Sequence, residues 1–187
     1  SFDQTLARAG YNLAHVYLES GRIEEARDIL DDLLEDDPDN SIVLSTLGWA
    51  YYLEGELERA LEVYRRVHER LPGDVDALYN KAALLRRLDR HEEALEAFLE
   101  LQEQRPSAEY LSAIADLYEL LDRPAEAVKY LERYVTESDK AVEERVRLAD
   151  LYADVRDYGK SVAMYEEALD RMEQPDPQVL FRKGRVL

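Results

Sequence analysis

The feature that most constrains this sequence is an internal repeat with a period of 34 residues. Three alanines and three prolines recur at this spacing, and each alanine lies 12 residues before its proline. The recurring residues are Ala26, Ala60, Ala94, Pro38, Pro72 and Pro106. A fixed period of this length is typical of proteins that stack one supersecondary unit many times. We therefore expect a stack of similar units that share a continuous core.

Each unit has the pattern of two amphipathic helices joined by a short turn. In the second unit, apolar residues recur at helical spacing over 44–51 and again over 57–64. Gly55 lies between these segments, where a glycine can end a helix. Asp74 is placed to cap a helix that begins near Val75. Because Val, Ile and Thr form no alternating runs typical of strands, the sequence predicts an all-α fold.

Small residues mark where the two helices of a unit should meet. Gly48 and Ala60 have minimal side chains, so we expect the helices of the second unit to approach closely there. A series of tyrosines that recurs with the period is predicted to lie in the core. Its members are Tyr17, Tyr51, Tyr118 and Tyr152.

Aligning the units gives a pattern common to five of them. The first halves align as Leu13-Ala14 with Tyr17, Leu47-Gly48 with Tyr51, Lys81-Ala82 with Leu85, Ile114-Ala115 with Tyr118, and Leu148-Ala149 with Tyr152. In the second halves, a small residue is followed four residues later by a large apolar one: Ala26 and Leu30, Ala60 and Tyr64, Ala94 and Phe98, Ala127 and Leu131, Ser161 and Tyr165. This pattern resembles the tetratricopeptide repeat. The resemblance implies a right-handed α-solenoid, a superhelix of antiparallel helix-turn-helix units that works as a protein-binding scaffold.

The resemblance covers essentially the whole chain as one solenoid domain, 1–187. The repeats lie near 7–40, 41–74, 75–107, 108–141 and 142–176, and a truncated sixth first helix spans 177–187. Two positions depart from the family pattern. The usual Trp position holds Gly10, Leu44, Leu78, Leu111 and Arg145, and Asp139 and Glu173 replace the closing proline. The chain begins at Ser1 without Met, so we interpret it as a piece of a longer protein.

The resemblance implies a concave groove lined by the first helix of each unit, and the helical arc opposite the core supplies its candidate residues. In the first three units these are Tyr11, Asn12, His15, Trp49, Tyr52, Tyr79, Asn80, Arg86 and Arg87. In the last two units they are acidic and include Asp116, Glu119 and Asp150. We interpret the first half as a surface that binds an extended peptide, with Trp49 as its main anchor because aromatic rings give large contact areas.

Each of these candidates also has a purely structural interpretation. Trp49 is equally suited to packing against the first helix of a neighbouring unit. Arg86 and Arg87 are also suited to pairing with nearby carboxylates at the surface. The acidic stripe also fits a solvated face in a chain that is acidic everywhere. The groove type that clamps a terminal carboxylate in this family is disfavoured, because Asp76 stands at one of its matching positions.

Composition excludes several classes of activity. With 42 acidic against 24 basic residues, the net charge of -18 disfavours nucleic acid and direct membrane binding. The chain has no cysteine, and its three histidines show no metal-ligand spacing. Gly159-Lys160-Ser161 lacks the upstream glycine of a phosphate-binding loop. We predict no enzyme activity, no cofactor and no metal. No feature identifies a compartment, and the cytoplasm is taken as the default.

The sequence therefore predicts a non-catalytic scaffold that binds a protein or peptide segment in the groove of the repeats. One alternative is a self-assembling structural module that associates through the exposed ends of the solenoid. Another is an accessory interaction region of a larger enzyme or signalling protein. The identity of the partner is not encoded in any pattern found here.

Overall fold

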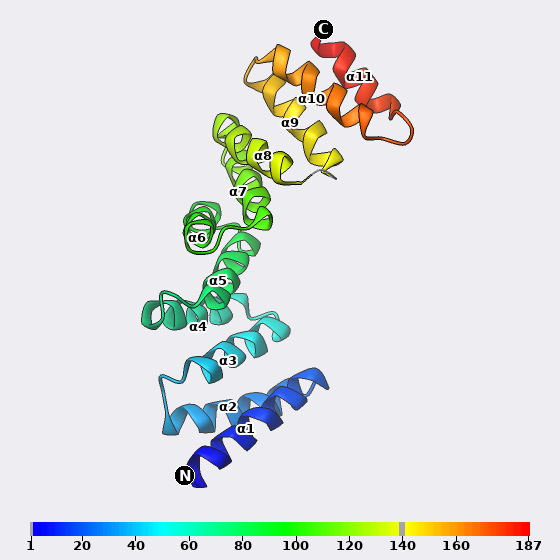
Figure 1. Cartoon of the computed structure of the whole chain (residues 1–187). Helices are drawn as coiled ribbons and strands as arrows, with labels where there is room; N and C mark the ends of the chain where they lie inside the picture. The colour runs from blue at the N-terminus through cyan, green and yellow to red at the C-terminus, as the bar shows by residue number, and fades with distance from the viewer. Residues whose placement is uncertain (1, 139–140) are drawn as a thin grey trace. The chain divides into compact units, whose positions relative to one another are not determined.

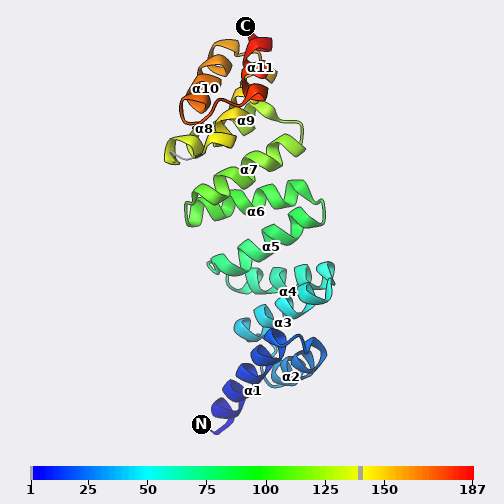
Figure 2. The same ribbon diagram turned by 90° about the vertical axis from the view of Figure 1, so that its right-hand side faces the viewer.

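The computed structural model describes residues 2–138 and 141–187, and all of the regular structure in these ranges is helical. Within 2–87 and within 108–187, each helix packs against the next one along the chain (Figures 1 and 2). This arrangement confirms the predicted all-α solenoid. The helices are α1 (Phe2–Glu19), α2 (Ile23–Asp36), α3 (Ser41–Glu54), α4 (Leu57–Arg70), α5 (Val75–Arg87), α6 (His91–Gln104), α7 (Ala108–Leu120), α8 (Pro124–Glu137), α9 (Val142–Asp154), α10 (Tyr158–Asp170) and α11 (Pro177–Val186).

The chain forms two compact units, residues 1–97 and 98–187, and the boundary between them falls inside α6. The first unit contains α1 to α5 with the start of α6, and the second contains the rest of α6 with α7 to α11. The assignment of 1–187 to a single domain with the repeat limits given above stays a prediction. Asp139, one of the predicted departures from the repeat pattern, lies outside the described residues.

The caps predicted from the sequence are present. Asp74 is the N-cap of α5, and its Oδ1 accepts a hydrogen bond of 3.0 Å from the backbone N–H of Ala77. Gly55 ends α3 with a φ of 80°, in the left-handed region where glycine has no steric penalty. The corresponding turns of the third, fourth and fifth hairpins adopt the same conformation without glycine. There the residues with positive φ are Asp89, Asp122 and Arg156, at 55°, 56° and 64°.

The first hairpins pack around small residues, as expected, but the contact at Gly48 differs from the predicted one. A Cβ added at Gly48 would lie 2.9 Å from Cε2 of Tyr64, so the glycine makes room for the Tyr64 ring. Ala60 is fully buried in α4. Bulk at position 48 would therefore collide first with an aromatic side chain of the facing helix.

The tyrosine series is buried in three of its four members. Tyr51, Tyr118 and Tyr152 lie in the core, as predicted. Tyr17 is only half-buried, so its assignment to the core is wrong. Its hairpin is the first of the stack, and the guanidinium of Arg22 covers its ring at 4.1 Å.

A cation lies over the tyrosine of each of these four hairpins, and it comes from an oppositely charged pair three residues apart at the helix-turn-helix junction. We call this pair the turn pair. The third hairpin also has a turn pair, although Leu85 stands there in place of the tyrosine. In chain order the turn pairs are Arg22 and Glu25, Glu56 and Arg59, Arg90 and Glu93, Arg123 and Glu126, and Asp157 and Lys160. The order is reversed in the second and fifth hairpins. Arg59 nevertheless lies over the ring of Tyr51 at 4.1 Å, and Lys160 over Tyr152 at 5.0 Å.

Arg145, which stands at the usual Trp position of the fifth unit, is a buried structural residue. Only 3% of it is exposed, and its guanidinium donates to the backbone carbonyls of Val135, Ser138 and Ala141 at 2.9, 3.2 and 2.9 Å. These carbonyls lie at and just beyond the end of α8, where helices leave acceptors unpaired. Arg145 thus connects the end of α8 to the start of α9.

The first helix exposes an apolar face that later helices bury. Leu13 and Val16 are 44% and 56% exposed, whereas the residues one period later, Leu47 and Ala50, are 6% and 0% exposed. The difference arises because α2 packs against α3, while α1 has no earlier described hairpin.

In the part of the chain that the structure describes, no helix is long and apolar enough to cross a membrane.

Candidate functional site

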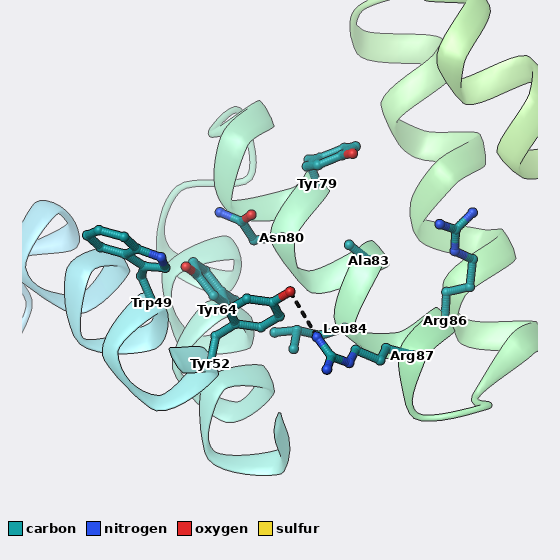
Figure 3. A pocket seen from close by; sticks show the side chains of 9 residues that line it. All are labelled: Trp49, Tyr52, Tyr64, Tyr79, Asn80, Ala83, Leu84, Arg86 and Arg87. Carbon is teal, nitrogen blue, oxygen red and sulfur yellow. Dashed lines mark hydrogen bonds between the residues drawn. The ribbon is translucent and has the colours of Figure 1, made fainter. Parts of the chain in front are cut away.

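The groove residues predicted in the first half of the chain, except Asn12, gather at two adjoining cavities in the first compact unit. The first, which we call the arginine cavity, has a volume of about 610 Å³ (Figure 3). It is lined by Trp49, Tyr52, Tyr64, Tyr79, Asn80, Ala83, Leu84, Arg86 and Arg87. All of these come from α3, α4 and α5, so the cavity lies between the first helices of two successive hairpins, over α4.

The second cavity, which we call the aspartate cavity, also has a volume of about 610 Å³. It shares Trp49, Tyr64 and Asn80 with the arginine cavity. Its other lining residues are Tyr11, His15, Ser41, Ile42, Ser45, Thr46, Asp74, Asp76 and Ala77. The three shared residues therefore lie where the two cavities join.

Trp49 both packs against a neighbouring hairpin and lines the two cavities. Its ring lies 5.6 Å from the ring of His15 on α1, so it packs against the first helix of the neighbouring hairpin. It is only partly buried, and its remaining surface lines both cavities. Tyr11 extends this aromatic group, with its ring 6.4 Å from that of His15.

Tyr52 and Arg87 form a direct contact between α3 and α5. Nη1 of Arg87 donates a hydrogen bond of 2.8 Å to the hydroxyl of Tyr52, and the guanidinium carbon lies 5.2 Å from the centre of that ring (Figure 3). Arg87 thus contacts the hydroxyl and the ring of Tyr52, which is an uncharged side chain. This differs from the predicted alternative, in which the arginine pairs with a carboxylate.

Tyr64 is a lining residue that the sequence analysis missed, because it was assigned to the core stripe of the second helix. Its ring passes Gly48, and its hydroxyl donates a hydrogen bond of 3.2 Å to the carbonyl of Ser45. Burial raises the pKa of the Tyr64 hydroxyl to about 12, so the hydroxyl stays a neutral donor at physiological pH. Gly48, which faces the Tyr64 ring, was the sequence signal that could have indicated this position.

The remaining candidates of the first half take different positions. Tyr79 and Asn80 are half-buried and line the arginine cavity, and Asn80 also faces the aspartate cavity. Arg86 is exposed at the rim of the arginine cavity. Asn12 is exposed on α1 and is not among the described residues that line either cavity.

The acidic candidates of the second half are held in ion pairs within the chain. Nη1 of Arg147 lies 2.5 Å from Asp116 and its Nη2 lies 2.5 Å from Glu119. Asp150 is 2.7 Å from Nη1 of Arg182 and accepts a hydrogen bond from the hydroxyl of Tyr165. Each arginine comes from the first helix of the next hairpin. The stripe is therefore partly neutralised, which neither sequence interpretation included.

Among the side chains of the described residues, no group of three or more His, Asp or Glu is arranged to hold a metal ion. The described groove combines aromatic, amide and charged side chains with aliphatic and hydroxyl ones. An arrangement of this kind can bind a ligand by ring stacking, amide hydrogen bonds and charge.

The described residues thus define an α-solenoid of helical hairpins with a groove between successive first helices. Sequence models of the tetratricopeptide repeat match residues 11–75, 51–117, 108–140 and 145–173. Together these matches span most of the chain. The chain belongs to the tetratricopeptide repeat family.

Solved structures of several tetratricopeptide repeat proteins share this fold. MamA from Desulfovibrio magneticus RS-1 matches with a TM-score of 0.73 and 18% identity, covering 88% of this chain and 94% of that one. YrrB matches with a TM-score of 0.75 and 17% identity, covering 94% of this chain and 90% of that one. PilF from Pseudomonas aeruginosa matches with a TM-score of 0.65 and 21% identity, covering 100% of this chain and 89% of that one. A comparison with curated proteins gave no match.

Proposed function

We propose that this chain is a non-catalytic scaffold that binds an extended peptide segment of another protein in the groove formed by the arginine and aspartate cavities. Membership of the tetratricopeptide repeat family supports the general role, because its repeats are generally interaction modules without catalysis. The observation that carries the specific site is Trp49. A half-buried indole at the junction of two adjoining cavities offers a large, rigid contact surface.

The groove has a second property that suits an extended chain. Asn80 lies at the same junction, and its amide offers both a donor and an acceptor to a peptide backbone. The structure of YrrB is described as that of a tetratricopeptide repeat protein with an unusual peptide-binding site. That description applies to YrrB and is compatible with the same class of ligand here.

A display library of random dodecapeptides, selected on the whole chain, tests the proposal. Peptides that bind the groove should lose at least about tenfold in affinity when Trp49→Ala and Tyr52→Ala are combined, because removing buried aromatic anchors costs more than about 1.4 kcal/mol. The matched control is Tyr158→Ala with Phe181→Ala, which removes two exposed aromatic side chains from the other compact unit. Circular dichroism should show unchanged helicity in both variants. Equal binding by the groove variant and the unmodified chain would contradict the proposed site.

Self-association is a second candidate role, and the exposed face of α1 favours it. Leu13 and Val16 present apolar surface at positions that are buried in the next hairpin. Exposed apolar side chains at positions that are buried in an equivalent hairpin can form an association site.

A further inference from the structure

The two cavities of the groove carry opposite charges. Of the described residues that line the arginine cavity, the charged ones are Arg86 and Arg87, and none is acidic. Asp74 and Asp76 line the aspartate cavity, and among its described lining residues only His15 can carry positive charge. The arginine cavity is thus a local basic site in a chain whose net charge is -18.

The polarity follows from the direction of α5. Asp74 caps the start of this helix and Asp76 lies in its first turn, whereas Arg86 and Arg87 occupy its last turn. This distribution complements the helix dipole, which favours acids at the start of a helix and bases at its end. Because α5 runs along the groove from one cavity to the other, the charges that stabilise the helix also give the groove two distinct ends.

Arg87 is positioned to bind a carboxylate. Most arginine side chains with described partners in the first compact unit pair with acids, such as Arg27 with Glu54 at 2.8 Å. Arg87 instead contacts the neutral hydroxyl and ring of Tyr52. The guanidinium has five N–H groups, so one hydrogen bond from Nη1 leaves other N–H donors for a ligand. The neutral hydroxyl does not compensate the positive charge of Arg87. Tyr52 therefore holds a charged guanidinium at the cavity through one hydrogen bond and its ring.

We propose that the groove selects a peptide of opposite charges at its two ends, with an acidic side chain at Arg87, a bulky apolar side chain at Trp49, and a basic side chain at Asp76. This inference rests on the proposed function and specifies its ligand. Charge complementarity of this kind fixes the register of a bound segment and excludes partners of the wrong charge. It also explains how a strongly acidic protein can bind an acidic residue at one position.

The peptides selected from the random dodecapeptide library provide the probe. We expect Asp or Glu on one side of an apolar residue and Lys or Arg on the other, at frequencies above those of the unselected library. Replacing the acidic residue of a selected peptide by its amide should weaken binding to the unmodified chain about tenfold. The same replacement should have no effect on an Arg87→Gln variant, since glutamine can still donate to Tyr52 but carries no charge. Asp76→Asn should remove the effect of the basic residue in the same way.

The control is Arg70→Gln, which removes an exposed arginine that pairs with Asp39 at 2.7 Å and lines neither described cavity. This variant should retain the full acid-to-amide effect. Two results would overturn this inference while leaving the proposed function intact. In the first, the peptides need Trp49 and Tyr52 but show no charge preference. In the second, the acid-to-amide replacement weakens binding to the Arg87→Gln variant as much as binding to the unmodified chain. Peptides that bind the Trp49 and Tyr52 variant normally, or a library without binders, would contradict the proposed function itself.

Discussion

At the scale of single residues, the turns between the two helices of each hairpin show how the sequence tolerates an unfavourable conformation. Gly21 and Gly55 adopt positive φ without cost, but Asp89, Asp122 and Arg156 adopt the same region with a Cβ atom. Aspartate visits this region more readily than most residues, whereas arginine has no local advantage there. Arg156, with a φ of 64°, is therefore the most strained of the five.

Replacing Arg156 by glycine should stabilise the protein. The left-handed conformation costs a non-glycine residue about 1–2 kcal/mol, and glycine loses about half of that gain through its larger unfolded-state entropy. The expected gain is about 0.5–1 kcal/mol, or a rise in melting temperature of roughly 1–4 °C for a chain of this size, followed by circular dichroism. Arg156→Ala keeps the Cβ and should give no rise. A similar rise in both variants would show that strain at position 156 is not the cause.

At the scale of elements, the turn pair explains why reversed charge orders occur in one chain. Either order places a cation over the tyrosine of the hairpin, as Arg22 does over Tyr17 and Arg59 does over Tyr51. The hydrogen bond from Arg22 lowers the pKa of the Glu25 carboxyl, and the one from Arg123 does the same for Glu126. Both partners of these two pairs come from one turn, whereas Glu93 of the third hairpin also pairs with Arg65, and Lys160 of the fifth also pairs with Glu132.

Exchanging the order in the second hairpin should therefore be tolerated. Arg59→Glu alone removes the nearer of the two cations over Tyr51, leaving Arg27 at 5.5 Å, and places two acids three residues apart, so it should lower the melting temperature by roughly 1–3 °C. Adding Glu56→Arg recreates the order of the first hairpin and should restore most of the loss. Thermal unfolding of the two variants and the unmodified chain measures both effects. A double variant no more stable than the single one would show that the two orders are not equivalent.

At the scale of the whole molecule, the apolar face of α1 is where association between copies is expected. Leu13 and Val16 occupy positions that a preceding hairpin covers elsewhere in the stack. We expect concentration-dependent dimers in sedimentation velocity, and we expect Leu13→Glu with Val16→Glu to abolish them by placing charge on that face. Leu120→Glu, at an exposed leucine of the other compact unit, is the matched control and should leave association unchanged. A strict monomer at high protein concentration would exclude this role.

Much of this molecule could be predicted from the sequence because the repeat gives each position several independent observations. The helices, the cap at Asp74 and the turn at Gly55 follow from residue type and spacing. The positive φ of Asp89 and Arg156 could not be predicted in this way, since neither residue favours that region strongly enough to signal it. Only the period, applied from Gly55 onwards, would have found them.

The candidate site was predicted less completely than the fold. Trp49, Tyr52 and Arg87 share an exposed arc of helices that the repeat places side by side, so their gathering at one cavity followed from the pattern. Tyr64 was missed because a core position on the second helix can reach the groove when a glycine faces it. The partner of Glu119 was missed because Arg147 lies 28 residues away, on the next first helix, and helical periodicity does not identify such pairs.

The turn pairs restrict how the repeats of this chain can be recombined into new proteins. A crossover in the loop after a second helix carries each hairpin over intact, together with its charges. A crossover inside the turn joins halves of two pairs, and the result depends on their order. Fusing the chain up to Arg22 with the chain from the position after Glu56 would place Arg22 three residues before Arg59 and leave two cations beside one tyrosine. Libraries built by shuffling these repeats should therefore be cut between hairpins and not within them.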